Sequence, residues 1–222
     1  MPIAVKPRID KKNLKPITIK AGEAFSFECD VQGEPPPEKT WSLEPAKKGV
    51  KAGPVGSRAT VTNEDYKTTI AVKRAERADA GTYTITAKND SGVDNATVEV
   101  VVLDKPVMPG GPLEVNNVHA KHCDLKWNAP EDDGGSPIEA YEVEKYDVAA
   151  AKWVPVGRTK EPSFHVEGLE PGHQYKFRVK AINAQGPSEE LVTDKPILAK
   201  NPYGRMKMIL INNMKNFYTL NT

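Results

Sequence analysis

The patterned segments of this chain alternate between apolar and polar residues with a period of two, which is typical of half-buried β-strands. The segment 23–31 shows the pattern best, and its apolar residues fall on one face of a strand: Phe25, Phe27, Cys29 and Val31. No segment carries the 3.6-residue apolar period of a long helix. The sequence therefore predicts an all-β protein.

Turn signals separate the alternating segments. After Val31, the prolines at 35, 36 and 37 interrupt strand pairing, because proline has no N–H to donate to a neighbouring strand. Five further candidate strands follow at 39–43, 58–62, 67–73, 82–88 and 93–103. About seven short antiparallel strands in so short a stretch are typical of a β-sandwich.

Length and charge balance narrow the class of function. With 222 residues, the chain is long enough for two domains of about 100 residues each. Lys and Arg total 31 against 30 for Asp and Glu, a net charge of +1, so no strong positive field favours nucleic acid or an anionic membrane. The N-terminus lacks the apolar segment of a signal peptide, and no apolar run approaches the roughly 20 residues that span a bilayer. We therefore expect neither nucleic acid nor a membrane as a partner.

The chain has only two cysteines, Cys29 and Cys123. Two cysteines are too few for a disulfide scaffold and do not suit a four-ligand zinc site. We expect both to be free thiols, which is consistent with a reducing, cytoplasmic compartment.

Motifs in the first half of the chain carry a family resemblance. Cys29 is followed by Trp41, and residues 79–83 spell Asp-Ala-Gly-Thr-Tyr, the D-x-G-x-Y pattern of a tyrosine corner. This stretch, residues 6–103, resembles an immunoglobulin domain of the intermediate set. The family's second cysteine would fall at Ile85, so the resemblance implies that the inter-sheet disulfide is absent and that Ile85 packs against Cys29 and Trp41 instead.

The second half differs in pattern. Cys123, Leu125 and Trp127 share one face of a candidate strand, and residues 169–179 read L-x-P-G-x-x-Y-x-F-R-V. This region, about residues 109–200, resembles a fibronectin type III domain. The resemblance implies that Leu169 lies in the core and that Tyr175 occupies the tyrosine corner of a second β-sandwich.

We predict two β-sandwich domains in tandem, followed by a short non-homologous tail. The parts are an immunoglobulin-like domain at 1–103, a fibronectin type III domain at 104–200 with its proline-rich linker at 104–112, and an irregular tail at 201–222. Prolines at 106, 109 and 112 keep the linker extended, so the domains are expected to lie in line and to unfold nearly independently. Residues 204–222 contain neither proline nor an acidic residue, which indicates an abnormal chain end; a short amphipathic helix is the alternative.

An immunoglobulin domain without its disulfide, joined by such a linker to a type III domain, resembles the repeating modules of the giant muscle proteins. Invertebrate twitchin and projectin are the nearer likeness and titin the more distant. The resemblance implies a non-catalytic segment in sarcomere organisation, elasticity and myosin thick-filament binding, in the cytoplasm at the A-band, with neighbouring modules as further partners. Two alternatives stay open: an extracellular adhesion or receptor fragment, and a regulatory flank of a giant muscle kinase.

No residue is predicted to be catalytic, cofactor-binding or metal-binding, and we expect neither enzyme activity nor a small-molecule substrate. If the segment around His119 is a strand, His119 and Cys123 share one face and His122 points away, so the cluster does not predict zinc. We interpret Asp132 and Asp133 as solvated loop charges rather than calcium ligands.

A few other residues have a candidate role outside the core. Trp153 is expected to be partly exposed in a strand and is a candidate protein contact. Asn89 and Asn95 each begin a glycosylation sequon, which matters only outside the cell. Arg77 and Asp79 are expected to pair next to the tyrosine corner.

Overall fold

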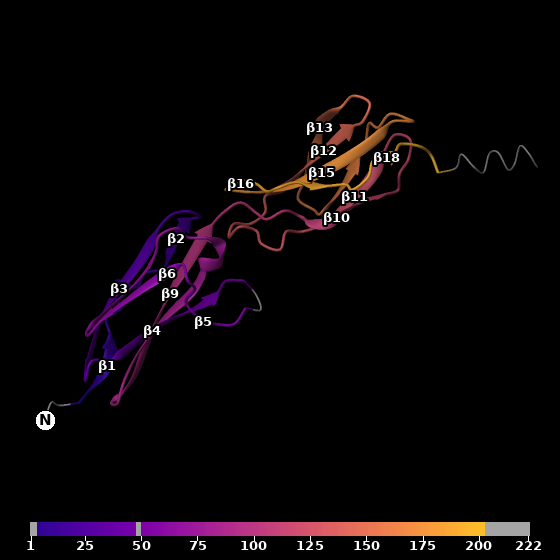
Figure 1. Ribbon diagram of the computed structural model, residues 1–222. Helices are drawn as coiled ribbons and strands as arrows, with labels where there is room; N and C mark the ends of the chain where they lie inside the picture. The colour runs from indigo at the N-terminus through magenta and orange to yellow at the C-terminus, as the bar shows by residue number, and fades with distance from the viewer. Residues whose placement is uncertain (1–3, 48–49, 203–222) are drawn as a thin grey trace, which may run out of the picture. The chain divides into compact units, whose positions relative to one another are not determined.

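The computed structural model describes residues 4–47 and 50–202 (Figure 1). The chain divides into two compact units: the first runs to Asp104 and includes Gly134–Ser136, and the second comprises Lys105–Asp133 and the chain from Pro137 onward. Apart from the short 3-10 helix η1 (Arg77–Asp79), every regular element in this described part is a strand, which confirms the all-β prediction. No helix within it is long and apolar enough to cross a bilayer. The tail from residue 203 onward lies outside the described residues.

The first unit is a sandwich of two sheets. One sheet has the order β1, β3, β7, β6, formed by Val5–Ile9, Phe25–Glu34, Lys67–Val72 and Ala59–Glu64. The other has the order β2, β9, β8, β4, β5, formed by Ile17–Lys20, Gly92–Leu103, Gly81–Asn89, Glu38–Pro45 and Gly53–Pro54. Neighbouring strands are antiparallel except β2 and β9, which are parallel.

The alternation seen in the sequence builds the core between these sheets. In β3, every second side chain from Phe25 to Val31 is buried. Trp41 of β4 lies opposite Ile85 of β8, and both side chains belong to the core. The indole Nε1 of Trp41 donates a hydrogen bond to Thr68 Oγ1 at 3.0 Å. Ile85 therefore fills by packing the position at which the family has a cysteine.

The candidate strands of the first unit correspond to β3, β4, β6, β7, β8 and β9, whereas β1, β2 and β5 are not indicated by the sequence. Pro7 lies inside β1, Pro16 directly precedes β2, and β5 has only two residues, so the alternation signal is weak in all three. Pairing also continues further along β3 than the sequence predicts. Glu34 still belongs to β3 because Val5 of β1 lies opposite it.

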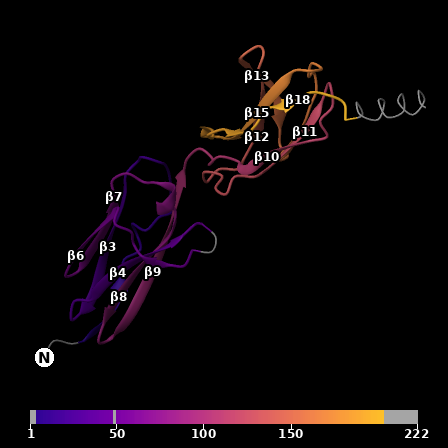
Figure 2. The same ribbon diagram turned by 45° about the vertical axis from the view of Figure 1, so that its right-hand side comes forward.

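The second unit also has two sheets. The smaller has the order β10, β11, β14, formed by Gly110–Asn116, Cys123–Asn128 and Ser163–Val166. The larger has the order β13, β12, β15, β16, formed by Lys152–Thr159, Ala140–Asp147, Gln174–Asn183 and Gly186–Pro187. Two short strands also pair with β15: β17 (Leu191–Val192) and β18 (Ile197–Leu198). Strand pairing places β12 between β13 and β15, and Figure 2 shows these strands from a second direction.

The core of the second unit contains the residues that the type III resemblance implied. Three residues predicted to share a face of β11 are buried: Cys123, Leu125 and Trp127. Leu169 is also buried in this core. The hydroxyl of Tyr175 accepts a hydrogen bond from the Glu170 backbone N–H at 3.0 Å, which ties the strand to the preceding turn. The roles predicted for Leu169 and Tyr175 agree with this geometry.

Each core contains one free, buried cysteine, Cys29 in the first unit and Cys123 in the second. Burial raises the pKa of the Cys29 thiol to about 11 and that of the Cys123 thiol to about 12. Because the thiolate is the reactive form, both groups are nearly inert at neutral pH while their core is intact. Either thiol becomes reactive when its own unit unfolds.

We therefore expect two thiols per chain by titration in denaturant without reductant, and almost no reaction in the native state. When the intact chain is labelled at increasing urea concentration and digested, the peptides around Cys29 and Cys123 report the unfolding of each unit separately by mass spectrometry. Rapid native labelling of either cysteine contradicts its burial. A titration that finds no thiols in a monomer contradicts the reduced state.

Candidate functional site

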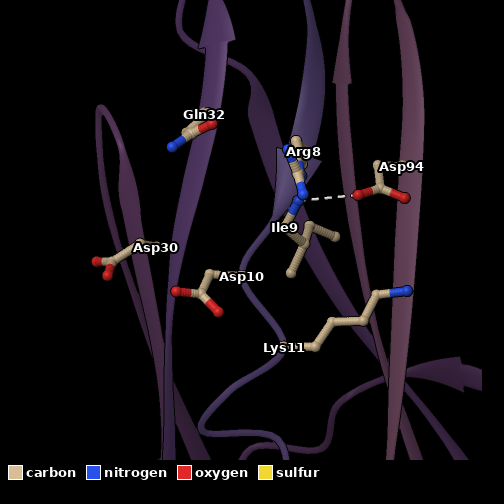
Figure 3. A pocket seen from close by; sticks show the side chains of 7 residues that line it. All are labelled: Arg8, Ile9, Asp10, Lys11, Asp30, Gln32 and Asp94. Atoms are coloured by element: carbon tan, nitrogen blue, oxygen red, sulfur yellow. Dashed lines mark hydrogen bonds between the residues drawn. The ribbon is translucent and has the colours of Figure 1, made fainter.

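A shallow hollow in the first unit lies where β1 ends (Figure 3). It is lined by Arg8, Ile9, Asp10, Lys11, Asp30, Gln32 and Asp94. The acids in it already have partners: the Ile9 backbone N–H donates to Asp94 Oδ2 at 2.8 Å, and Lys12 Nζ lies 3.0 Å from Asp10 Oδ2 and 3.4 Å from Asp30 Oδ2.

The electrostatics of this hollow do not resemble those of a catalytic site. Hydrogen bonds from the backbone and side chain of Lys12 lower the pKa of the Asp10 carboxyl, and the same pair raises the pKa of the Lys12 ammonium. Both groups keep their charge near neutral pH, whereas a general acid or base has a pKa close to the working pH. The hollow is therefore a surface on which the acids are held by Lys12 and by a backbone N–H.

The histidines of the second unit are arranged differently from the strand-based prediction. His119 and His122 lie in the loop between β10 and β11, with their rings stacked at 4.5 Å between centroids. His122 lies 5.3 Å from the ring of His165, whose Nδ1 is 2.6 Å from Asp124 Oδ1. Cys123 points into the core, away from them. In the described part of the chain, no three His, Cys, Asp or Glu side chains are placed to hold a metal ion.

The loop acids have structural contacts. The backbone carbonyl of Asp132 accepts a hydrogen bond from Val107 N at 3.0 Å, and the carbonyl of Asp133 accepts one from Asn183 Nδ2 at 2.7 Å. These bonds tie the β11–β12 loop to the second unit through its backbone. They provide no side-chain oxygen cage of the kind that binds calcium.

The tyrosine corner of the first unit has a different ion pair from the one predicted. The hydroxyl of Tyr83 donates to the Asp79 carbonyl at 3.0 Å, as in a tyrosine corner. The Asp79 carboxylate pairs with Arg58, which precedes β6, at 3.1 Å. Arg77 instead donates to the Val102 carbonyl. The predicted pairing of Arg77 with Asp79 is therefore wrong, because the Asp79 carboxylate of η1 faces Arg58, which directly precedes β6.

The two sequons differ in accessibility. Asn89 Nδ2 donates to the carbonyls of Val5 and Pro35 at 2.9 and 3.0 Å, so this amide is engaged in the fold. Asn95 is exposed on β9. The folded domain thus leaves only the second of these two amide groups open to solvent.

The larger sheet of the second unit presents a patterned outer face. Tyr141 and Val143 of β12 point into the core, as do alternate residues of β15, so the residues between them lie on the opposite side. Strand register arranges this side in three rows across β13, β12 and β15: Trp153, Tyr146 and Lys176; Pro155, Glu144 and Arg178; Arg158, Glu142 and Lys180. We call these nine residues the outer face.

Trp153, the candidate contact, lies at one end of the outer face and is held by its neighbours. Its ring centroid is 5.3 Å from that of Tyr146, and the guanidinium carbon of Arg178 lies 4.3 Å from the Trp153 centroid. Arg178 is fixed in turn by Glu144 and by Glu190, the latter at 2.8 Å. Cation–π stacking on an already paired guanidinium holds the indole in one orientation.

Comparison with known families decides what the two units are. The family model of the immunoglobulin I-set domain matches residues 7–102, and that of the fibronectin type III domain matches residues 108–194. The chain is an I-set domain followed by a type III domain. Domains of these two families in titin-like proteins are typically non-catalytic.

The same tandem occurs in much longer proteins. The chain is 33% identical over 186 residues to slow-type myosin-binding protein C from Homo sapiens, covering 82% of this chain and 16% of that protein. It is 32% identical over 184 residues to titin from Drosophila melanogaster, covering 82% of this chain and 1% of that protein. A crystal structure of titin domains aligns with 90% of this chain and with 67% of the titin chain, at 32% sequence identity and with a TM-score of 0.46. The I-set and type III pair is therefore homologous to titin and myosin-binding protein C, and it spans a small part of either.

One histidine gives the type III domain a pH-dependent stability. Asp147 Oδ2 lies 2.8 Å from His173 Nδ1, and this hydrogen bond raises the pKa of His173 and lowers that of Asp147. A raised histidine pKa contributes stability that is complete below the ordinary value of about 6.5 and disappears as the pH rises through the folded value. The lowered Asp147 pKa gives a contribution that is present above about 4 and disappears on acidification.

We expect the type III domain to lose stability between pH 6 and pH 9, and His173→Gln to remove most of that loss. The measurement is the urea midpoint by tryptophan fluorescence, since Trp127 and Trp153 both report on this domain. His119→Gln is the control, because the His119 ring stacks on that of His122. Equal pH dependence in wild type and His173→Gln contradicts the assignment.

Proposed function

We propose that this chain is a non-catalytic structural and interaction segment of a titin-like muscle protein, of the twitchin kind. Its role is to contribute to sarcomere organisation and elasticity and to attach to the myosin thick filament of the A-band. The homology to titin and to myosin-binding protein C is the observation that carries this proposal. The name of myosin-binding protein C states that it binds myosin. This chain shares with it the tandem of an I-set and a type III domain.

The surfaces of both domains support recognition of protein rather than catalysis. The acids of the hollow on the I-set domain are bonded to Lys12 or to a backbone N–H, and most charged groups of the outer face are paired with one another. Surface ion pairs contribute little binding energy and are screened by salt. A single tandem therefore offers weak contacts, and useful attachment comes from many tandems on one filament, through high effective concentration.

The two buried thiols favour an intracellular site over the adhesion alternative. An I-set domain that holds its sheets together with Cys29, Trp41 and Ile85 needs no oxidising compartment for stability. The exposed Asn95 favours the adhesion alternative, because its sequon could be glycosylated in the secretory pathway. Secretory expression followed by mass measurement shows whether glycosylation at Asn95 is compatible with the fold.

The test of the proposed function is co-sedimentation of the intact chain with myosin filaments, with actin filaments as the comparison. We expect weak binding to myosin filaments, with a Kd of about micromolar or weaker, that falls as salt rises because screening shortens the reach of surface charges. Binding to actin alone, or tight binding to a cell-surface ectodomain with none to filaments, contradicts the proposal.

A further inference from the structure

The charges of the outer face are balanced in two of its three rows. In the third row, Glu142 pairs with Arg158 at 2.9 Å. In the middle row, Arg178 pairs with Glu144 and with Glu190. Lys180 lies 3.9 Å from Glu144 Oε2 and 3.7 Å from Glu190 Oε2 and is neutralised by the same two acids. These rows carry no charge that is free to attract a partner.

The first row differs, because it combines two aromatic rings with an unpaired cation. Lys176 lies next to Tyr146 in the strand register, and no carboxylate among the described residues lies within 4.0 Å of its ammonium group. Asp147 of β12 lies on the other side of the sheet and is bound to His173. This end of the outer face therefore carries uncompensated positive charge.

Apolar surface surrounds the same end. Val148 in the β12–β13 turn is 42% exposed. Trp153 is already oriented by Arg178, so a partner need not spend binding free energy to order it. Aromatic and arginine side chains that are held in place in this way are typical of the residues that dominate protein interfaces.

The edge strand β13 limits how a partner can bind here. Pro155 lies on this edge and has no N–H, and the β12–β13 register shifts between Val143 and Glu144. An edge interrupted by a proline and a register shift is a poor template for an added strand. Recognition at this end must therefore run through side chains of the outer face.

We propose that the Trp153, Tyr146 and Lys176 end of the outer face binds an acidic segment of a partner protein that also carries aromatic or aliphatic side chains. Carboxylates meet the unpaired ammonium group of Lys176, and an apolar side chain packs on Trp153. A basic segment meets like charge at the same place, so the surface discriminates between the two. This inference rests on the proposed function in so far as both make the type III domain a protein-binding module.

The test titrates the intact chain with a random copolymer of glutamate and tyrosine, and separately with one of lysine and tyrosine. Binding is followed by NMR through backbone amides and the Trp153 indole N–H. We expect the acidic copolymer to bind and to shift the signals of Trp153, Tyr146 and Lys176, and the basic copolymer not to bind. Trp153→Ala should weaken binding about tenfold or more, as loss of an anchoring tryptophan does.

A charge-reversal pair provides the control in case Trp153→Ala disturbs the fold. Lys176→Glu should weaken binding about fivefold at low salt and less at high salt, whereas Lys160→Glu, an equal charge change outside the outer face, should leave it within about twofold. Equal effects of the two reversals overturn the proposal. So do an absence of acidic-copolymer binding, shifts confined to other surfaces, or equal shifts of Trp153 with phosphatidylserine vesicles.

The outcome is separable from that of the proposed function. If the chain binds myosin filaments but ignores the acidic copolymer, the muscle role stands and the acidic-segment inference fails. If it binds the copolymer at Trp153 but no filament, the inference stands and the filament proposal fails.

Discussion

Replacing Trp41 with alanine should destabilise the I-set domain by about 3 to 5 kcal/mol, as deletion of a large buried aromatic does. Trp41 is only 5% exposed, lies opposite Ile85, and donates its indole N–H to Thr68. The substitution leaves a cavity between the sheets and removes the donor for the Thr68 hydroxyl. The I-set core has no disulfide, so no cross-link restricts the conformations of the unfolded chain and offsets these two losses.

The measurement is the urea dependence of Cys29 labelling in the intact chain, because this thiol reports on the I-set domain alone. Tyr66→Ala is the matched control: Tyr66 is 49% exposed and its hydroxyl donates to Glu34 at 3.1 Å, so its loss should cost less than about 1 kcal/mol. A Trp41→Ala loss below about 1 kcal/mol shows that the core is wrongly assigned.

Replacing Gly81 with alanine should be about as damaging. Gly81 has a φ of +150°, which disfavours any side chain, and a Cβ there would lie 2.1 Å from the Glu44 carbonyl oxygen and 2.9 Å from Pro45 Cα. Both neighbours are backbone atoms of β4, the strand that pairs with β8 at this point, so they cannot move without breaking the pairing. We expect a loss of about 3 kcal/mol or more from strain and overpacking together.

Gly53→Ala in β5 is the control for Gly81→Ala, since a Cβ at Gly53 meets no atom within 4 Å. Both variants remove one glycine from the chain, so a difference between them reports on the close approach at Gly81. The same labelling of Cys29 measures each. Similar midpoints for the two variants contradict the close packing of β8 against β4.

Much of the fold follows from local patterns in the sequence, whereas the strands β1 and β2, which the sequence does not indicate, share one physical cause. Strands such as β3 and β8 bury every second side chain, so their alternation is visible in the sequence itself. The strands β1 and β2 are short, and each is fixed by a partner far along the chain: β1 pairs with β3, and β2 with the end of β9. Local sequence carries little of the free energy that forms them.

The candidate site depends even more on pairing between distant segments. Trp153 could be recognised from the sequence as a partly exposed aromatic residue. The sequence does not show that Lys176 is unpaired, because this depends on the register between β12 and β15. That register places Tyr146 beside Lys176, whereas Arg178 and Lys180 lie beside Glu144 and Glu142. The pairing of Asp79 with Arg58 rather than Arg77 likewise depends on the fold, since it joins η1 to a turn 21 residues earlier in the chain.

The most direct test of the central claim compares this two-domain chain with a longer array of such tandems in co-sedimentation with myosin filaments at low and moderate salt. The account predicts weak, salt-sensitive binding of the single tandem and much tighter binding of the array, because linkage raises the effective concentration of each weakly binding module. An array that binds no better than the single tandem contradicts the account.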